Sequence, residues 1–393
     1  MIRIERRLET PRWVGPAMPL AALLVALGIV AVVLLVTGHA PVSTYGSMLR
    51  ASLTDNGALS ATLANATPIV FTGLCAAVAF RMRVYNIGGE GQLYVGAIGA
   101  AGAALALGGQ PGIVIVLGAM AGGTVAGALW AAVPGFLRSY LNTNEILTSL
   151  MLNYVAGLLA YYLIFDSNSF WRDVSSPSAN VFPQGKTIDA AGWWPAIHLG
   201  GVTVPLGFVV GLLVATSLLL MLRWTRFGFQ LRVMSDSPAA GRYAGMRTKR
   251  AILTVMVLSG ALAGFAGASQ VGDFSHLLDP QGLQQASYGY TGIVAAALAR
   301  FNPLAVLLSA VFLGAVNNAG FALQGATFPQ GLVGTMEGII LFCVLSAELL
   351  SRYRIRLRRP GAPVRAAASV EAGATGPEPA SGAGAVLESL PKS

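Results

Sequence analysis

Residues 17–37 read AMPLAALLVALGIVAVVLLVT, an apolar stretch of about 21 residues without a charged side chain. A helix needs about 20 apolar residues to cross the hydrocarbon core of a bilayer. The stretch is too long for the apolar part of a typical signal peptide, and no small-residue cleavage site is evident. We therefore expect an uncleaved first transmembrane helix, preceded by a cytoplasmic N-terminal segment at residues 1–16.

The composition extends this pattern over most of the chain. Of the 393 residues, 55% are hydrophobic and 10% are charged, whereas about a quarter of the residues of an ordinary soluble domain are charged. We expect an all-α, polytopic membrane helix bundle, with one transmembrane permease domain over residues 17–350. The ten expected spans are 17–37, 59–80, 91–108, 112–133, 146–165, 203–222, 251–271, 288–300, 303–323 and 330–350.

The basic residues set the expected orientation, because Lys and Arg near span ends mark the cytoplasmic side. With the N-terminus inside, all but three of the 25 basic residues face the cytoplasm, the exceptions being Arg50, Arg172 and Lys186. This asymmetry favours an even number of spans with both termini cytoplasmic. The two halves then have opposite orientations, as in inverted-repeat transporters. The net charge of +9 sits at the ends of apolar runs, beside membrane lipid, and indicates no nucleic-acid partner.

The eighth segment is too short to cross the membrane alone. Its 13 residues from Tyr288 to Arg300 reach about 20 Å as a helix, against a hydrocarbon core of about 30 Å. Short or broken helices at membrane depth occur where they are buried in protein or line a cavity, and in transporters they often border the pathway. We expect either such a helix or a longer span that begins near Leu283.

Two long connections and a tail complete the organisation. The outer loop, 166–202, contains three tryptophans and several prolines, which suits a membrane interface or a surface that meets a partner. The inner loop, 223–250, contains seven basic residues. Residues 351–393 begin with a basic run and continue without periodicity in Ala, Gly, Pro and Glu, so we expect a disordered cytoplasmic tail.

Glycines four residues apart occur inside several expected spans. Small residues at this spacing let helix backbones approach closely in a membrane. The pattern predicts a tightly packed bundle, with the pairs Gly118–Gly122, Gly123–Gly127 and Gly260–Gly264.

The sequence lacks the marks of an enzyme. The three histidines are far apart in outer loops, so no metal site is expected. Cys75 and Cys343 both fall inside spans, which argues against a disulfide framework. The triplet Gly185–Thr187 resembles the end of a P-loop, but Asn180 stands where the first glycine belongs. We expect no cofactor, and an ATP-driven role then requires a separate ATPase.

Polar residues gather at the start of the third span, in the stretch Tyr85–Gln92. A carboxylate near membrane depth is a functional candidate by default. The alternative is that Glu90 pairs with Arg81 or Arg83 and caps its own helix. The pathway or gate candidates from this stretch are Asn86, Gly88, Gly89, Glu90 and Gln92.

A second polar group opens the fifth span. Glu145, Ser149 and Asn153 are spaced four residues apart and therefore share one helix face. That face either lines the pathway or forms hydrogen bonds between helices. Tyr288 and Tyr290, at the start of the eighth segment, are further pathway candidates.

Four blocks of the sequence resemble one family of membrane proteins. They extend from the second span to the ninth, and so cover nearly all of residues 59–350. The blocks resemble the permease subunits of ribose, branched-chain amino acid and nucleoside ABC importers, most closely those of the nucleoside type. They are Tyr85–Gln92, Asn144–Tyr154, Gly228–Met246 and Tyr288–Pro303.

The third block implies a docking site for an ATPase, because in this family it is the cytoplasmic loop that contacts the ATPase. The residues around Pro238 suit a helix start, and Pro238–Tyr243 is expected to form a short surface helix. The alternative is a basic loop that rests on anionic lipid. The ATPase-coupling residues that the resemblance implies are Ser235, Asp236, Pro238, Ala239, Ala240, Arg242, Tyr243 and Gly245.

The resemblance also implies a complex in the bacterial inner membrane. This chain would be the channel-forming subunit, beside ATP-binding subunits, a second related permease subunit and an external substrate-binding lipoprotein. The expected cargo is a nucleoside moved by alternating access, with simple sugars or branched-chain amino acids as alternatives. A rival from another class is a secondary transporter that uses Glu90, Glu145 or Glu337 as its ion site. The role of Glu337 stays open.

Overall fold

The computed structural model describes residues 2–6, 14–175, 179, 181–324 and 331–357. The chain divides into two compact units, one of Met1–Leu8 with Arg352–Ser393 and one of Glu9–Ser351. In the smaller unit, strand β1 (Ile2–Arg6) pairs antiparallel with strand β4 (Tyr353–Leu357). The sequence analysis predicted neither strand. Residues 358–393, where we expected a disordered tail, lie outside the described residues.

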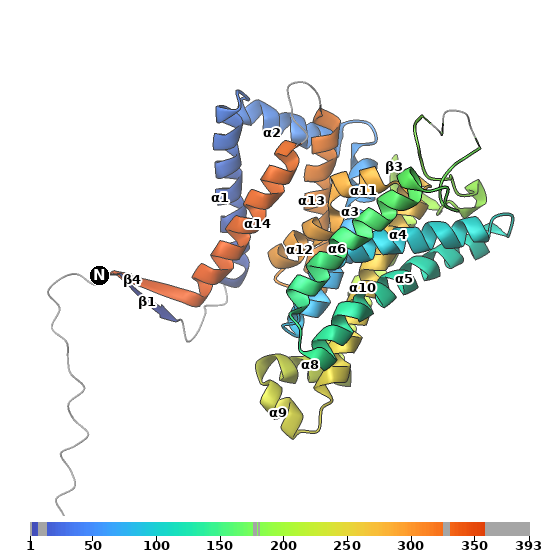
Figure 1. Cartoon of the computed structure of the whole chain (residues 1–393). Helices are drawn as coiled ribbons and strands as arrows, with labels where there is room; N and C mark the ends of the chain where they lie inside the picture. Colours follow the sequence, from blue (N-terminus) through green and yellow to red (C-terminus); the bar gives the residue numbers. More distant parts are fainter. Residues whose placement is uncertain (1, 7–13, 176–178, 180, 325–330, 358–393) are drawn as a thin grey trace, which may run out of the picture. The chain divides into compact units, whose positions relative to one another are not determined.

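The larger unit is built mainly of helices (Figure 1), so the helical class predicted from the sequence is confirmed. Short π-helical turns, η1 (Arg50–Thr54), η2 (Tyr162–Asp166) and η5 (Gln270–Ser275), extend three of the helices. The α-helices are α1 (Val14–Val36), α2 (Pro41–Leu49), α3 (Ala58–Arg81), α4 (Gly89–Ala106), α5 (Gly112–Leu141), α6 (Glu145–Tyr161), α7 (Leu206–Trp224), α8 (Arg226–Asp236), α9 (Pro238–Tyr243), α10 (Thr248–Ser269), α11 (Pro280–Ala286), α12 (Tyr288–Leu298), α13 (Pro303–Leu323) and α14 (Gly331–Arg352).

Six helical stretches among the described residues are long and apolar enough to cross a membrane, or seven if α1 and α2 form one span bent by 116°. Ten complete spans are therefore not confirmed. The segments expected at 91–108, 288–300 and 330–350 are helical but do not meet the same test. Helix α4 owes this to the polar side chains of Glu90 and Gln92 in its first turn, which lower its hydropathy, and α12 to its length of 11 residues. The six are Ala58–Arg81, Gly112–Leu141, Glu145–Asp166, Leu206–Trp224, Thr248–Ser275 and Pro303–Leu323.

Helix α3 lies at the centre of the larger unit, since 83% of its apolar window is buried inside the protein. It contacts α10, α12 and α13, and the aromatic ring of Phe71 on α3 packs against that of Phe265 on α10 at 4.5 Å between centroids. Helix α10 in turn contacts α4 and α5. The buried polar residues of α3 and α10, such as Thr72 and Ser259, are thus enclosed by other helices.

Helices α5 and α10 cross at glycines. A Cβ atom at Gly264 would overlap the carbonyl oxygen of Gly123, and one at Gly127 would lie 2.5 Å from the Cα atom of Gly264. A Cβ atom at Gly260 would lie 2.5 Å from the carbonyl oxygen of Gly127. The close packing predicted from these glycine pairs is therefore confirmed.

The eighth expected segment is a broken helix. Helix α11 ends at Ala286, and Ser287 adopts a left-handed backbone with φ of 48° before α12 begins at Tyr288. The short or broken helix predicted from the sequence is confirmed, and the alternative of one continuous span from Leu283 is wrong. The break arises because a left-handed residue cannot continue a right-handed helix.

The outer loop folds back onto the end of α10. It contains an antiparallel hairpin of β2 (Ala196–Leu199) and β3 (Val202–Pro205), so the span expected at 203–222 begins later, at Leu206. The Trp194 backbone N–H donates a hydrogen bond to the carbonyl of Gly272 at 3.0 Å. This hairpin was not predicted from the sequence of the outer loop, because strands of four residues are too short to show a clear alternating pattern.

Candidate functional site

The connection between α3 and α4 is a tight polar turn. Arg83 has a left-handed backbone, with φ of 57°. The Asn86 Oδ1 atom accepts hydrogen bonds from the Gly88 N–H and from Gln92 Nε2, both at 3.0 Å. Asparagine often closes turns in this way, by bonding the backbone two residues further on. The turn places Gly89 at the first position of α4 and buries the polar face of that helix start.

The Asn86 amide also joins three helices. Its Nδ2 atom donates to Gln92 Oε1 of α4 and to Ser259 Oγ of α10, both at 2.9 Å. Ser259 Oγ donates to the carbonyl of Cys75 on α3 at 2.9 Å. Asn86 and Gln92 are each 1% exposed. Because each buried amide finds partners, the network stabilises a single packing of α3, α4 and α10.

The polar face of α6 binds the backbone of the same turn. Glu145 Oε1 accepts a hydrogen bond from the Tyr85 N–H at 3.4 Å, and Ser149 Oγ accepts one from the Ile87 N–H at 3.3 Å. Asn153 Oδ1 accepts from the Gly91 N–H at 2.9 Å, and Asn153 Nδ2 donates to the Ile87 carbonyl at 3.0 Å. The geometry thus favours the second alternative from the sequence, hydrogen bonding between helices.

Glu145 is also held by an ion pair. Its Oε2 atom lies 3.2 Å from Arg138 Nε, which comes from the last turns of α5. The Glu145 side chain is nearly buried, whereas that of Arg138 is 40% exposed. The pair fixes the short connection between α5 and α6, and occupies the carboxylate that a secondary transporter would need.

Glu90 takes a partner that the sequence did not suggest. Its Oε2 atom accepts a hydrogen bond from the Gly289 N–H in the first turn of α12. A carboxylate at a helix N-terminus is stabilised by the unpaired N–H groups and by the helix dipole. Glu90 therefore caps α12, a role that neither alternative from the sequence included.

The two tyrosines of α12 extend the cluster in different directions. The buried Tyr288 hydroxyl donates to Asn65 Oδ1 on α3 at 3.0 Å, and its carbonyl accepts from Thr72 Oγ1 at 2.8 Å. The Tyr290 hydroxyl accepts from Asn153 Nδ2 at 3.3 Å and is 38% exposed. The sequence analysis missed Asn65 and Thr72, whose seven-residue spacing on one helix face was the available signal.

All ten pathway candidates therefore lie in or beside one cluster, which we call the polar core. It joins α3, α4, α6, α10 and α12, and whether cargo passes it stays a prediction. Glu337 lies in α14, but its side chain is outside the described part of the structure. No group of three or more His, Cys, Asp or Glu side chains that could hold a metal occurs among the described residues.

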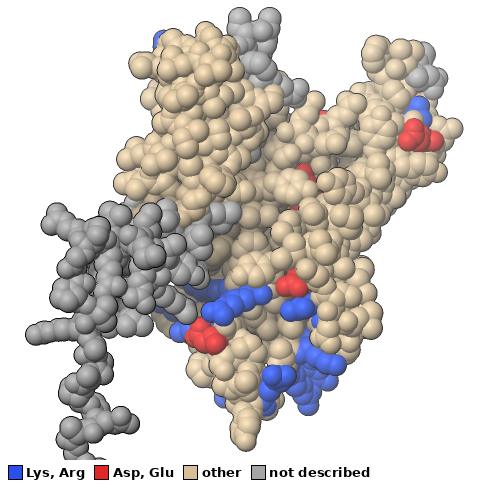
Figure 2. Space-filling model, turned by 60° about the vertical axis from the view of Figure 1, so that its left-hand side comes forward, with Lys and Arg blue, Asp and Glu red and all other residues tan. Residues whose placement is uncertain are grey.

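The expected ATPase-coupling residues lie elsewhere, on α8, on α9 and, for Gly245, in the turn after α9. The short surface helix predicted at Pro238–Tyr243 is confirmed as α9, and Ser237 caps it by accepting from the Ala240 N–H at 3.3 Å. Ser235 is half-buried and the other coupling residues are exposed, Tyr243 completely. Figure 2 shows Lys and Arg side chains gathered at the end of the larger unit where Figure 1 places α8 and α9.

Helix α8 was not predicted within the inner loop. It runs from Arg226 to Asp236 and buries Leu231 and Met234, while its exposed face carries polar side chains together with Phe229, which is 60% exposed. Gly241 of α9 is buried beside Met234, where a Cβ atom would lie 3.1 Å from Met234 Cγ. This amphipathic helix was not predicted because the loop as a whole is charged and has low hydrophobicity.

Comparison with known proteins places the chain in a family. A family profile described as "Branched-chain amino acid transport system / permease component" matches residues 58–345. The glucose ABC transporter permease protein TsgB13 of Haloferax volcanii is 29% identical over 90% of this chain and 93% of its own length.

Two nucleoside permeases are similar over comparable lengths. The guanosine ABC transporter permease protein NupP of Bacillus subtilis is 28% identical over 88% of this chain and 97% of its own. The nucleoside ABC transporter permease protein NupB of Lactococcus lactis is 26% identical over 83% and 89%, respectively. Such relatives are transport subunits of the sugar and nucleoside importer type, not enzymes. The chain belongs to the permease family of the branched-chain amino acid transport systems, among the ABC permeases of the ribose and nucleoside type.

Proposed function

We propose that this chain is the pathway-forming subunit of an ATP-driven importer and that a separate ATPase docks on α9. The observation that carries the proposal is the geometry of α9. A six-residue helix, capped by Ser237 and started by Pro238, presents Arg242 and a completely exposed Tyr243. Exposed aromatic and arginine side chains on a fixed support are typical anchors of a protein interface.

The contacts of α9 give docking a route into the membrane helices. Helix α9 packs on α8 and also contacts α10, while α8 contacts α7 and α3. Arg232 of α8 donates to the carbonyl of Leu222 on α7 at 3.2 Å. A displacement of α9 by ATP binding or hydrolysis is therefore transmitted to α7 and α10, which supports alternating access.

The proposed topology has ten passes, with both termini in the cytoplasm. The short helices count as passes in this scheme: α11 and α12 together form one broken pass, while α4 and α14 each form one. Residues 1–16, 223–250 and 351–393 then face the cytoplasm and 166–202 faces outward. The opposite orientation of the two halves is part of the same proposal.

The proposed cargo is a nucleoside. Two of the three relatives named above are nucleoside permeases. At the edge of the polar core, Tyr154 and Tyr290 are 64% and 38% exposed, and aromatic faces of this kind stack on nucleobases. Glucose, the cargo named for the Haloferax protein, is the alternative. Uptake of a radiolabelled nucleoside, competed by other nucleosides but not by glucose or ribose, tests the assignment.

The docking site is tested by replacing Tyr243 with alanine. We expect Tyr243→Ala to lower ATP-dependent uptake about tenfold or more, the effect of losing one interface anchor of about 2 kcal/mol, with normal membrane insertion. The matched control is Tyr162→Ala, which removes an exposed tyrosine (54%) from η2, the turn that extends α6. Equal uptake by Tyr243→Ala and wild type would contradict docking on α9.

The energy source separates the importer from a secondary transporter. The importer requires its partners, namely ATP-binding subunits, a second related permease and an external binding lipoprotein. Uptake should stop on ATP depletion and persist with an uncoupler while ATP is maintained. Uptake that persists on ATP depletion but stops with an uncoupler would show that an ion gradient drives transport, with Glu90 or Glu145 as the candidate ion site.

A further inference from the structure

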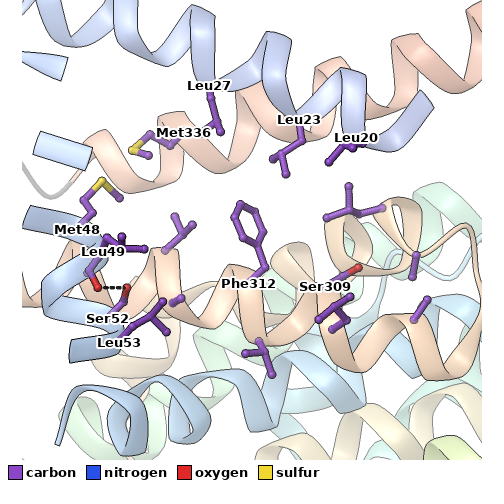
Figure 3. Close-up of a pocket in the computed structure, with 18 of the residues that line it drawn as sticks. Leu20, Leu23, Leu27, Met48, Leu49, Ser52, Leu53, Ser309, Phe312 and Met336 are labelled. Atoms are coloured by element: carbon purple, nitrogen blue, oxygen red, sulfur yellow. Dashed lines mark hydrogen bonds between the residues drawn. The ribbon is translucent and has the colours of Figure 1, made fainter. Parts of the chain in front are cut away.

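A large apolar cleft lies between α1 and α13, away from the polar core. Its volume is about 1060 Å³, and it extends to α2, η1 and α14. Figure 3 shows Leu20, Leu23 and Leu27 of α1 facing Phe312 of α13 across the cleft, with Met48 at one end. We call this space the α1–α13 cleft.

The cleft is long, and most of its lining residues are apolar. One face of α13 lines it from Asn302 to Ala319, which is about 25 Å of helix at 1.5 Å per residue. Its hydroxyl groups are largely engaged within the protein: Tyr45 donates to the Leu27 carbonyl at 2.7 Å, and Ser52 to that of Leu49 at 3.3 Å. The walls therefore suit hydrocarbon chains rather than a polar cargo such as a nucleoside or a sugar.

One end of the cleft is cationic. Arg81, at the end of α3, and Arg300, before α13, both line it, and both side chains are exposed. Neither forms an ion pair with a carboxylate of the described residues. The charge of Arg232 acts on Arg81 as well, and the positive end of the α13 dipole follows at Asn302. An anion at this end would face two arginines that form no ion pair with a carboxylate of the described residues.

We propose that the α1–α13 cleft binds an anionic phospholipid, with its acyl chains along α13 and its phosphate between Arg81 and Arg300. The charge complementarity of the two ends selects this occupant: hydrocarbon for the apolar walls and an anionic headgroup for the arginines. Basic sites between membrane helices bind anionic lipid headgroups by the same chemistry. In the topology proposed above, the arginine end lies in the cytoplasmic leaflet. The lipid then joins α1 to the rest of the bundle.

Native mass spectrometry of the full-length chain tests the proposal. The purified protein is exchanged into micelles that contain equal amounts of phosphatidylglycerol and phosphatidylcholine. We expect wild type to retain one phosphatidylglycerol preferentially. The double variant Arg81→Gln/Arg300→Gln should lose about tenfold or more of that preference, because each arginine near a headgroup contributes to anionic lipid binding. The double variant Arg226→Gln/Arg247→Gln makes the same charge change outside the cleft and should retain the lipid.

A second pair of variants tests the acyl-chain part. Ala315 lines the cleft and Leu304 does not, although both belong to α13. Ala315→Phe should displace the bound lipid of either headgroup, and Leu304→Phe should leave it in place. Equal lipid retention by Ala315→Phe and wild type would overturn the proposal, as would an unchanged preference in Arg81→Gln/Arg300→Gln. Crosslinking of Leu308→Cys to a second permease subunit in the membrane would also overturn it, since the cleft would then be a protein interface.

Discussion

At the scale of single residues, Asn153 shows how the polar core joins separate helices. Its amide satisfies the Gly91 N–H and the Ile87 carbonyl, and it also donates to the Tyr290 hydroxyl. It is 4% exposed, so water does not compete for these groups. One side chain therefore joins α6 both to the turn before α4 and to α12.

Replacement of Asn153 by alanine should destabilise the folded protein by about 1–3 kcal/mol, because the buried Gly91 N–H and Ile87 carbonyl lose their partner. The measurement is the thermal unfolding temperature of the purified protein in detergent. Thr148→Ala is the control on the same helix, since the Thr148 hydroxyl bonds only to carbonyls of Asn144 and Glu145. If both variants unfold at the wild-type temperature, Asn153 does not stabilise this packing.

His276 gives the outer loop a dependence on pH. Its ring stacks on Trp193 with 4.1 Å between ring centroids, and burial lowers its pKa. The neutral ring is therefore favoured in the folded loop. The ordinary pKa of histidine is about 6.5. Well above that pH, His276 has no pH-dependent effect on the stability of the folded loop. As the pH falls from 6.5 towards the lowered pKa, the stability of the folded loop decreases.

We expect the fluorescence of Trp193, obtained by subtracting the signal of Trp193→Phe, to change as the pH falls below 6.5, because protonation of the His276 ring loosens the stack. His276→Asn should remove this change, and asparagine tolerates the left-handed backbone at this position, where φ is 56°. A pH profile that persists in His276→Asn would assign the titration to another group.

Ten residues of the polar core could be found from the sequence, but their partners could not. The spacing of Glu145, Ser149 and Asn153 predicted a shared polar face, and the structure has all three buried on one face of α6. Their partners are backbone groups of a distant turn, which carry no sequence signal. For the same reason nothing in the sequence indicated that Glu90 caps a helix about 200 residues away.

At the scale of helices, the crossing of α5 and α10 depends on the absence of side chains. Gly264→Ala should destabilise the protein by about 1–3 kcal/mol, because its methyl group would force α10 away from Gly123 and Gly127. The control is Gly28→Ala in α1, where a Cβ atom would meet nothing within 4 Å. That variant should be neutral or gain up to about 1 kcal/mol of helix propensity.

Thermal unfolding of both glycine variants checks this expectation. A Gly264→Ala protein as stable as Gly28→Ala would mean that the two backbones separate at little cost. The glycine spacing predicted close helix packing, since a helix needs small residues wherever another backbone comes close, but it did not indicate that α5 and α10 are the partners. Helices α8 and α2 escaped prediction because short amphipathic helices between spans resemble ordinary loops in composition.

At the scale of the whole molecule, the proposed orientation is tested by cysteine labelling. Ala240→Cys in α9 should resist a membrane-impermeant thiol reagent in intact cells and react once the membrane is opened. Phe182→Cys in the outer loop, 76% exposed, should react at once. Background is low because Cys75 and Cys343 are both buried. Rapid labelling of Ala240→Cys in intact cells would reverse the orientation and end the docking proposal.

The helical class and family of the molecule followed from sequence, whereas the number of complete spans did not. Apolar length identifies the long helices, and those are the six that meet the structural test. Helices α4 and α12 are enclosed by neighbours and need neither the length nor the hydrophobicity of a lipid-facing span. Their glycines and alanines reflect close packing against other helices. A count of spans based on length and hydropathy therefore does not include them.

The capping of α12 by Glu90 limits how this protein can move. Sliding α12 along α4 by one turn would break the hydrogen bond between the Glu90 carboxylate and the Gly289 N–H, and Asn153 binds α6 to the same assembly. The three helices therefore travel as one piece. Hinges belong at its margins, and the residues between α12 and α13 are suited to the role: Arg300 and Phe301 both already have left-handed backbones, with φ of 50° and 60°.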